Sequence, residues 1–162
     1  MNSDEQKMKR RVCKGTGAGQ GTRLASLNIR LGQAGRIEAA LWALQQGNVD
    51  VSFLQEMNMT KGIHTRHGVG YDVWEIETES RHQVGVSVVC RDEKGWQVEG
   101  TVNFGPSVVI FLLTLGARKW YVVGAYMPPK NVSAVHRVEQ ALRAAPNGLE
   151  IILIGDLNVR LR

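Results

Sequence analysis

The stretch from Leu149 to Asn158 reads Leu-Glu-Ile-Ile-Leu-Ile-Gly-Asp-Leu-Asn, and its continuous apolar part predicts a β-strand buried on both faces. The strand stops at Asp156 and Asn158, whose side chains point to the same side because side-chain direction in an extended segment repeats every two residues. The carboxyl ends of strands in open α/β sheets are where ligands bind. The stretch therefore predicts an α/β fold with a site at the end of this strand. A plain turn or a helix N-cap after a core strand is the alternative.

Two segments of the chain, residues 23–56 and 120–158, share the order strand, helix, strand. In the first, apolar residues from Ile37 to Leu44 follow the i, i+3, i+4, i+7 spacing of an amphipathic helix that Gly47 ends. In the second, Ser133 is the expected N-cap of a helix whose apolar face is Val135, Val138, Leu142 and Ala145. A helical crossover joins parallel strands, so both strands of a unit end at the same edge of their sheet.

A polar or aromatic residue follows each of these strands: Asn28, Glu56, Tyr126, and Asp156 with Asn158. If the two sheets stack with these edges together, the side chains converge in one cleft. The oxygen donors of Glu56, Asp156 and Asn158, without Cys or His, suit Mg²⁺ or Mn²⁺ rather than zinc. The alternatives are a surface carboxylate at Glu56 and an ordinary aromatic strand residue at Tyr126.

Between the two units the sequence predicts a loop and then a run of strands. Residues 57–70, with His64 and His67, have the glycines of a loop. The following strands are expected at residues 71–77, 84–90, 96–103, 108–115 and 120–126, paired as antiparallel hairpins and meanders. His136 is expected on a helix surface. The four tryptophans are expected in the core or at its edge; they are Trp42, Trp74, Trp96 and Trp120.

Length and composition suit one globular domain. The chain has 162 residues, of which 43% are hydrophobic and 22% charged. Its net charge of +5 is uneven: residues 1–23 hold six basic and two acidic residues, which leaves +1 for the remainder. Residues 1–22 are polar and glycine-rich, so we expect a flexible basic arm before a domain at 23–162. The basic cluster from Lys7 to Lys14 is compatible with phosphate contacts, with a nuclear import signal, or with simple solvation.

Cysteine usage and hydropathy favour an intracellular protein. Cys13 and Cys90 form neither a disulfide framework nor a metal motif. The chain shows no signal peptide, and its longest apolar stretch, Val108–Leu115, is far shorter than the roughly 20 residues needed to span a bilayer.

Five short motifs occur in order along residues 23–162. They are Ser26-Leu27-Asn28-Ile29-Arg30, Phe53-Leu54-Gln55-Glu56, Gly85-Val86-Ser87-Val88-Val89, Tyr126-Met127-Pro128 and Gly155-Asp156-Leu157-Asn158. In these motifs the chain resembles the endonuclease/exonuclease/phosphatase family, whose members include deoxyribonuclease I, and most of all the endonuclease domain of non-LTR retrotransposons that also encode a reverse transcriptase. The resemblance implies a four-layer α-β-β-α sandwich of two stacked mixed sheets and Mg²⁺-dependent hydrolysis of phosphodiesters, with DNA as the partner.

The resemblance also implies a role for each site residue. Glu56 would hold the metal with support from Asn28, and Asp156, at the same metal site, would orient or deprotonate the attacking water. Asn158 would hydrogen-bond the phosphate, and Tyr126 would contact it near the attacking or leaving oxygen.

One departure from the family pattern changes the expectation. Family members continue to a further metal-site aspartate and a Ser-Asp-His motif, whereas this sequence ends at Arg162. The resemblance then implies an incomplete second sheet with an exposed apolar edge near residues 151–154. It also implies impaired activity unless a partner supplies the remainder. That partner is either the C-terminal half of the domain or a reverse transcriptase in a longer polyprotein. Two alternatives remain: a phosphatase acting on a small phosphorylated substrate, and a non-catalytic phosphate-binding remnant.

Overall fold

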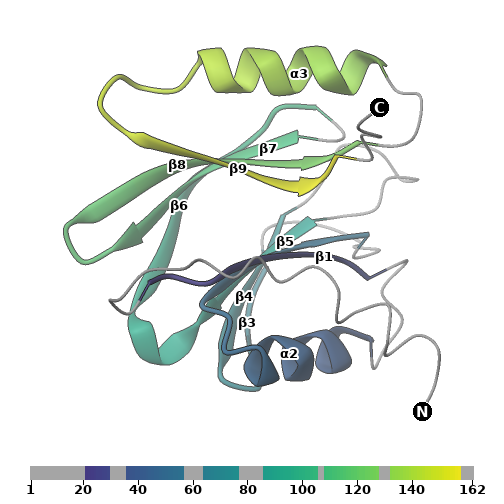
Figure 1. The fold of residues 1–162 in the computed structure, drawn as a ribbon, viewed down its shortest axis with the longest axis vertical. Helices are drawn as coiled ribbons and strands as arrows, with labels where there is room; N and C mark the ends of the chain where they lie inside the picture. Colours follow the sequence, from purple (N-terminus) through teal and green to yellow (C-terminus); the bar gives the residue numbers. More distant parts are fainter. Residues whose placement is uncertain are drawn as a thin grey trace.

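The computed structural model describes residues 21–29, 36–56, 64–76, 86–105, 108–127 and 132–157. The predicted basic arm lies outside these residues except for its last two positions. Two β-sheets stack face to face between two helices, which gives the four layers α-β-β-α that the sequence predicts (Figure 1).

The first sheet has five strands in the order β1-β2-β5-β4-β3, and the second has four in the order β6-β7-β8-β9. In the first sheet the strands are β1 (Leu24–Asn28), β2 (Val51–Gln55), β3 (His64–Gly68), β4 (Tyr71–Ile76) and β5 (Val86–Arg91). In the second they are β6 (Trp96–Asn103), β7 (Val108–Leu115), β8 (Arg118–Tyr126) and β9 (Glu150–Asp156), and a short 3-10 helix at Asp92–Lys94 joins the sheets. Both sheets are mixed, since β1 and β2 are parallel, β8 and β9 are parallel, and the other pairs are antiparallel.

Both strand–helix–strand units have the predicted parallel arrangement. In the first, α2 (Arg36–Gln46) joins β1 to β2, and Asn28 pairs in register with Gln55. In the second, α3 (Val132–Arg143) joins β8 to β9, and Tyr126 pairs with Asp156. The strands of each unit therefore end at a common edge.

Each helix covers the outer face of one sheet. The apolar face of α2 buries Ala40, Leu41 and Leu44 against β1, β2 and β4, as its spacing predicts. On α3 and just after it, the predicted Val138, Leu142 and Ala145 pack on β7 and β8, together with the buried Ala134 and Ala141, which the prediction omitted. In the described part of the chain, neither helix has the length and apolar character needed to cross a membrane.

Details of the two helices correct three predictions. Helix α3 begins at Val132, so Ser133 lies in its first turn and is not its N-cap. In the first turns of α3 the buried residue is Ala134, whereas Val135 is exposed. Trp42 of α2 is exposed rather than packed, because it lies on the face of the helix opposite Leu41 and Leu44.

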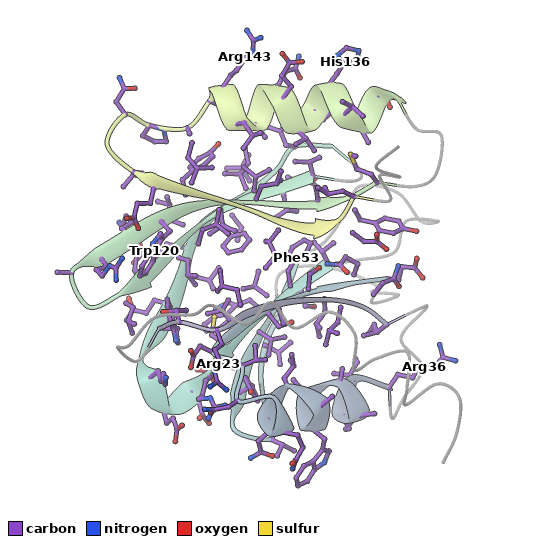
Figure 2. All side chains as sticks on the ribbon, in the orientation of Figure 1. Arg23, Arg36, Phe53, Trp120, His136 and Arg143 are labelled. Carbon is purple, nitrogen blue, oxygen red and sulfur yellow. The ribbon has the colours of Figure 1, made fainter. Side chains whose placement is uncertain are left out.

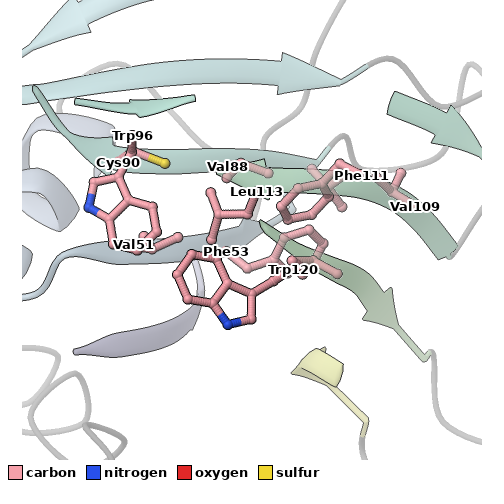
Figure 3. Close-up of a cluster of buried hydrophobic side chains, with 11 residues drawn as sticks. Val51, Phe53, Val88, Cys90, Trp96, Val109, Phe111, Leu113 and Trp120 are labelled. Carbon is pink, nitrogen blue, oxygen red and sulfur yellow. The ribbon is translucent and has the colours of Figure 1, made fainter. Parts of the chain in front are cut away.

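The core between the sheets is apolar and closely packed (Figure 3). Phe53 of β2 lies opposite Gly124 of β8, where a Cβ atom would come within 2.3 Å of its ring. Glycine at this position allows the two sheets to approach. Trp96 and Trp120 pack against each other in the same core, with ring centroids 5.6 Å apart. Cys90 is a free thiol there, and burial raises its pKa.

The structure corrects the predicted loop at residues 57–70, because His64–Gly68 forms β3. This strand pairs antiparallel with β4 through a tight turn at Val69 and Gly70, and Gly70 has a φ of 68°. The glycines that suggested a loop are therefore those of a hairpin, and His64 and His67 lie in an edge strand. Such a polar strand lacks the apolar alternation that identifies strands in a sequence.

The strand β9 is not buried on both faces. It is the last strand of its sheet among the described residues, and the side chains of Ile151 and Leu153 are 48% and 41% exposed. Only its inner side, with Ile152 and Ile154, packs against the core between the sheets. The exposed apolar edge that the sequence analysis expects is thus confirmed.

Candidate active site at the ends of four strands

Four of the five predicted site residues meet at one edge of the sandwich. Asn28 is the last residue of β1, and Glu56 follows β2. Tyr126 and Asp156 are the last residues of β8 and β9 and are in register with each other. Because the two sheets stack with these ends on the same side, residues separated by more than a hundred positions come into contact.

Direct hydrogen bonds connect the four side chains. Asn28 Nδ2 donates to Glu56 Oε1 at 2.8 Å and to Asp156 Oδ2 at 3.3 Å. The Tyr126 hydroxyl donates to Glu56 Oε1 at 2.7 Å. The Asn28 amide therefore lies between two carboxylates from different sheets, and both donors to Glu56 use the same carboxylate oxygen.

The backbone at this edge has two unusual conformations. Glu56 has a φ of 60°, in the left-handed region that side chains other than glycine seldom adopt. Gly155 has a φ of 151°, and a Cβ atom there would lie 1.7 Å from the carbonyl oxygen of Ala125. A glycine is thus required immediately before Asp156. Strained residues of this kind occur where the surrounding structure holds a side chain in a functional position.

Burial and two carboxylates change the acidity of Tyr126. Its partly buried phenol is desolvated, it donates to Glu56, and the charges of Glu56 and Asp156 oppose its ionisation, which together raise its pKa to about 12. Tyr126 is therefore protonated at neutral pH and acts as a hydrogen-bond donor rather than as a base.

The donor set fits a hard divalent cation. Glu56 and Asp156 present carboxylate oxygens, and Glu56 Oε2 carries none of the hydrogen bonds that hold Oε1. Asn28 faces the carboxylates with its NH₂ group and so holds them in place. Across the described ranges no group of three or more His, Cys, Asp or Glu residues comes together.

A buried glutamine beneath the site, with a partly buried serine as its partner, was not predicted from the sequence. Gln55 is fully buried and donates from Nε2 to Ser26 Oγ at 2.8 Å and to the Phe53 carbonyl at 3.0 Å. This contact joins β1 to β2 immediately before the site, since Ser26 lies two residues before Asn28 and Gln55 one residue before Glu56. A buried glutamine beside a glutamate is the available sequence signal, because an amide inside a strand needs a partner.

The remaining residues considered in the sequence lie away from this edge or outside the described residues. Asn158 is outside the described residues, as are Arg30 and Pro128 of the sequence motifs. His136 is on the outer surface of α3, with its side chain 71% exposed (Figure 2). This placement agrees with the surface role expected for it.

Comparison with known proteins identifies the fold. No family model matches the sequence, and no curated protein matches it. Solved structures do match. One is the endonuclease domain of TRAS1, a telomere-specific non-LTR retrotransposon, with a TM-score of 0.64 and 15% sequence identity. The match covers 87% of this chain and 61% of the TRAS1 chain. The mannosyl-6-phosphatase Bt3783 of Bacteroides thetaiotaomicron has a TM-score of 0.60 at 14% identity, with coverages of 86% and 66%. An endonuclease/exonuclease/phosphatase family protein of the same organism has a TM-score of 0.58 at 14% identity, with coverages of 84% and 63%.

The chain therefore has the endonuclease/exonuclease/phosphatase fold, also known as the deoxyribonuclease I-like fold. It spans about six-tenths of the length of these solved structures. At these identities the similarity defines the architecture, while the chemistry has to be argued from the site.

Proposed function

We propose that this chain is the metal-binding part of a phosphoester hydrolase that uses Mg²⁺ or Mn²⁺, with DNA phosphodiesters as its substrate. The observation that carries this proposal is the convergence of Glu56 and Asp156 from two different sheets, bridged by Asn28 and flanked by Tyr126. A nuclease or a phosphatase is also consistent with the functions of the structural neighbours.

The residues divide the chemistry between them. Glu56, through the oxygen not used by Asn28 and Tyr126, would hold the cation together with Asp156. The cation would supply electrostatic stabilisation of the charge that develops on the phosphoryl oxygens. Asp156, held by Asn28, would orient the attacking water and accept its proton. Tyr126, protonated at neutral pH, would donate a hydrogen bond to a phosphate oxygen, and Asn158 would donate another.

Two substrate classes fit this site. The TRAS1 domain is an endonuclease and Bt3783 is a mannosyl-6-phosphatase, yet both share the fold. A small phosphorylated substrate is therefore the second candidate, and the third is a phosphate-binding module without turnover, since the chain spans only part of its neighbours' length.

Hydrolysis with matched variants tests the proposal. Supercoiled plasmid, a small chromogenic phosphodiester and mannose 6-phosphate would be incubated with the protein in Mg²⁺ or EDTA. We expect Mg²⁺-dependent nicking that Asp156→Asn reduces at least 100-fold, and that Glu93→Gln, a change at an exposed carboxylate away from this edge, leaves unchanged. Nicking that persists in Asp156→Asn refutes the assigned site. Turnover of mannose 6-phosphate alone selects the phosphatase, and binding without turnover of any substrate selects the non-catalytic module.

A further inference from the structure

Two arginines lie on opposite sides of the candidate active site, one from each helix layer. We propose that Arg36 and Arg137 bind backbone phosphates of a nucleic-acid strand on the two sides of the phosphate that is cut. This inference rests on the proposed function and assigns specificity for a polymer, rather than for a small phosphorylated molecule, to two named side chains.

Arg36 is fixed next to the end of β1. It is the first residue of α2, and its Nη1 donates to the carbonyl oxygen of Ile29 at 3.4 Å. Ile29 directly follows Asn28, the residue that bridges the two carboxylates. The side chain is exposed and extends outward beyond the helix (Figure 2). Its guanidinium group therefore lies at the rim of the site on the side of the first sheet.

Arg137 occupies the corresponding side of the second sheet. It packs across Gly105, where a Cβ atom would come within 2.9 Å of its Nε. Gly105 precedes β7, whose first residue Val108 pairs with Ala125, the neighbour of Tyr126. The guanidinium group thus lies at the same edge of the sandwich as Tyr126.

Arg137 also has an unused hydrogen-bond donor. Its Nη1 is shielded from solvent and contacts no acceptor in the part of the chain that the structure describes. An unpaired donor on a charged, half-buried group is unfavourable unless an anion compensates it. A phosphate oxygen brought to this rim would provide the acceptor and the negative charge that this guanidinium group lacks among the described residues.

Five other basic side chains among the described residues are paired with carboxylates. Arg91 contacts Glu93, Lys119 contacts Glu99, and Arg143 contacts Glu139 at 2.7 Å. Arg118 and Lys94 pair with Glu150 and Asp50. These five cations are already partly neutralised by the carboxylates beside them.

The separation of the two arginines favours a polymer. Each arginine comes from the helix on the outer face of its own sheet, and stacked sheets lie about 10 Å apart, so the two side chains approach the site from different layers. A nucleic-acid strand carries one phosphate per roughly 3.4 Å of helix axis, so it presents phosphates on both sides of the phosphate at the centre. A small molecule with one phosphate presents none there.

The salt dependence of DNA binding tests this inference. The affinity of the full chain for a fluorescein-labelled DNA duplex would be measured by fluorescence anisotropy over a range of NaCl concentrations, in Ca²⁺. We expect Arg36→Gln and Arg137→Gln each to reduce the slope of log K against log[salt] by about 0.9, and the double variant by about 1.8. Arg143→Gln, at the far end of α3, is the matched control and should keep the wild-type slope. Arg36→Lys and Arg137→Lys retain the positive charge, so these variants should keep most of the wild-type slope.

Each outcome decides the inference separately from the proposed function. Slopes that fall in the two Gln variants, with native circular dichroism and retained slopes in the Lys variants, support it. Wild-type slopes in Arg36→Gln and Arg137→Gln overturn it, as does an equal loss in Arg143→Gln. If the wild type does not bind duplex DNA but hydrolyses the small phosphodiester, this inference fails while the hydrolase assignment stands.

Discussion

Replacing Gly124 with alanine should destabilise the protein by forcing the two sheets apart. The new Cβ would lie 2.3 Å and 2.5 Å from two ring atoms of Phe53, whereas carbon atoms pack favourably at about 3.5–4.0 Å. The ring has to move by roughly 1 Å, and it is 1% exposed, beside a void of about 10 Å³ that cannot accept it. Overpacking of this kind costs about 1–3 kcal/mol, and we expect the upper end, about 3 kcal/mol. For a domain of this size that lowers Tm by roughly 6–12 °C.

Urea and thermal unfolding with a double-mutant cycle would measure this effect. Phe53→Leu shortens the opposing side chain, so Gly124→Ala in that background should cost less than in the wild type by at least about 1 kcal/mol. Hydrolysis should fall as well, because Tyr126 and Glu56 lie two and three residues beyond the clash and their hydrogen bond is 2.7 Å long. A Gly124→Ala variant within about 0.5 kcal/mol of wild type, or strictly additive effects, would refute the packing described between β2 and β8.

Three further changes give distinct results. Asn28→Ala removes the hydrogen-bond donor between Glu56 and Asp156. It should lower the free energy of unfolding by about 1.5–3 kcal/mol in EDTA, and Mg²⁺ should restore part of this loss. Thermal melts with and without Mg²⁺ would measure both effects. In Tyr126, the folded-state pKa of about 12 exceeds the unfolded value of 10.0, so the stability linked to its proton is complete below pH 10 and is lost as pH rises towards 12. Tyr126→Phe should remove this loss and one phenolate from the near-ultraviolet titration; an unchanged titration would contradict the assignment. Leu153→Lys, on the exposed edge of β9, should change the free energy of unfolding by less than about 1 kcal/mol and reduce self-association measured by sedimentation velocity. Loss of the folded state in this variant would mean that the edge is buried.

The sequence predicts the fold where periodicity and connectivity agree. The helical spacing between Arg36 and Gly47, placed between two apolar strands, identifies a parallel unit, and the same order recurs around α3. Polar residues at the ends of these strands then predict which side chains come together. The structure brings four of them together because helical crossovers fix the direction of the strands they join.

The sequence fails where tertiary contacts decide the structure. The strand β3 is recognised only through its pairing with β4, since His64–Gly68 has no apolar alternation. The apolar run of β9 indicates complete burial, but only the neighbours of a strand determine which of its faces are covered. The left-handed backbone of Glu56 and the position of Arg137 beside Gly105 depend on contacts between distant segments, for which a single sequence carries no local signal.

Direct measurement of cation binding tests the central claim, which is that Glu56 and Asp156 form a site for a divalent metal ion. Titration of the protein with Mn²⁺, followed by the loss of the electron paramagnetic resonance signal of free Mn²⁺, reports occupancy without requiring turnover. We expect saturable binding that Mg²⁺ displaces, that Glu56→Gln weakens at least 10-fold, and that Glu93→Gln leaves unchanged. Equal binding by the wild type and Glu56→Gln, or no saturable binding by the wild type, would contradict it.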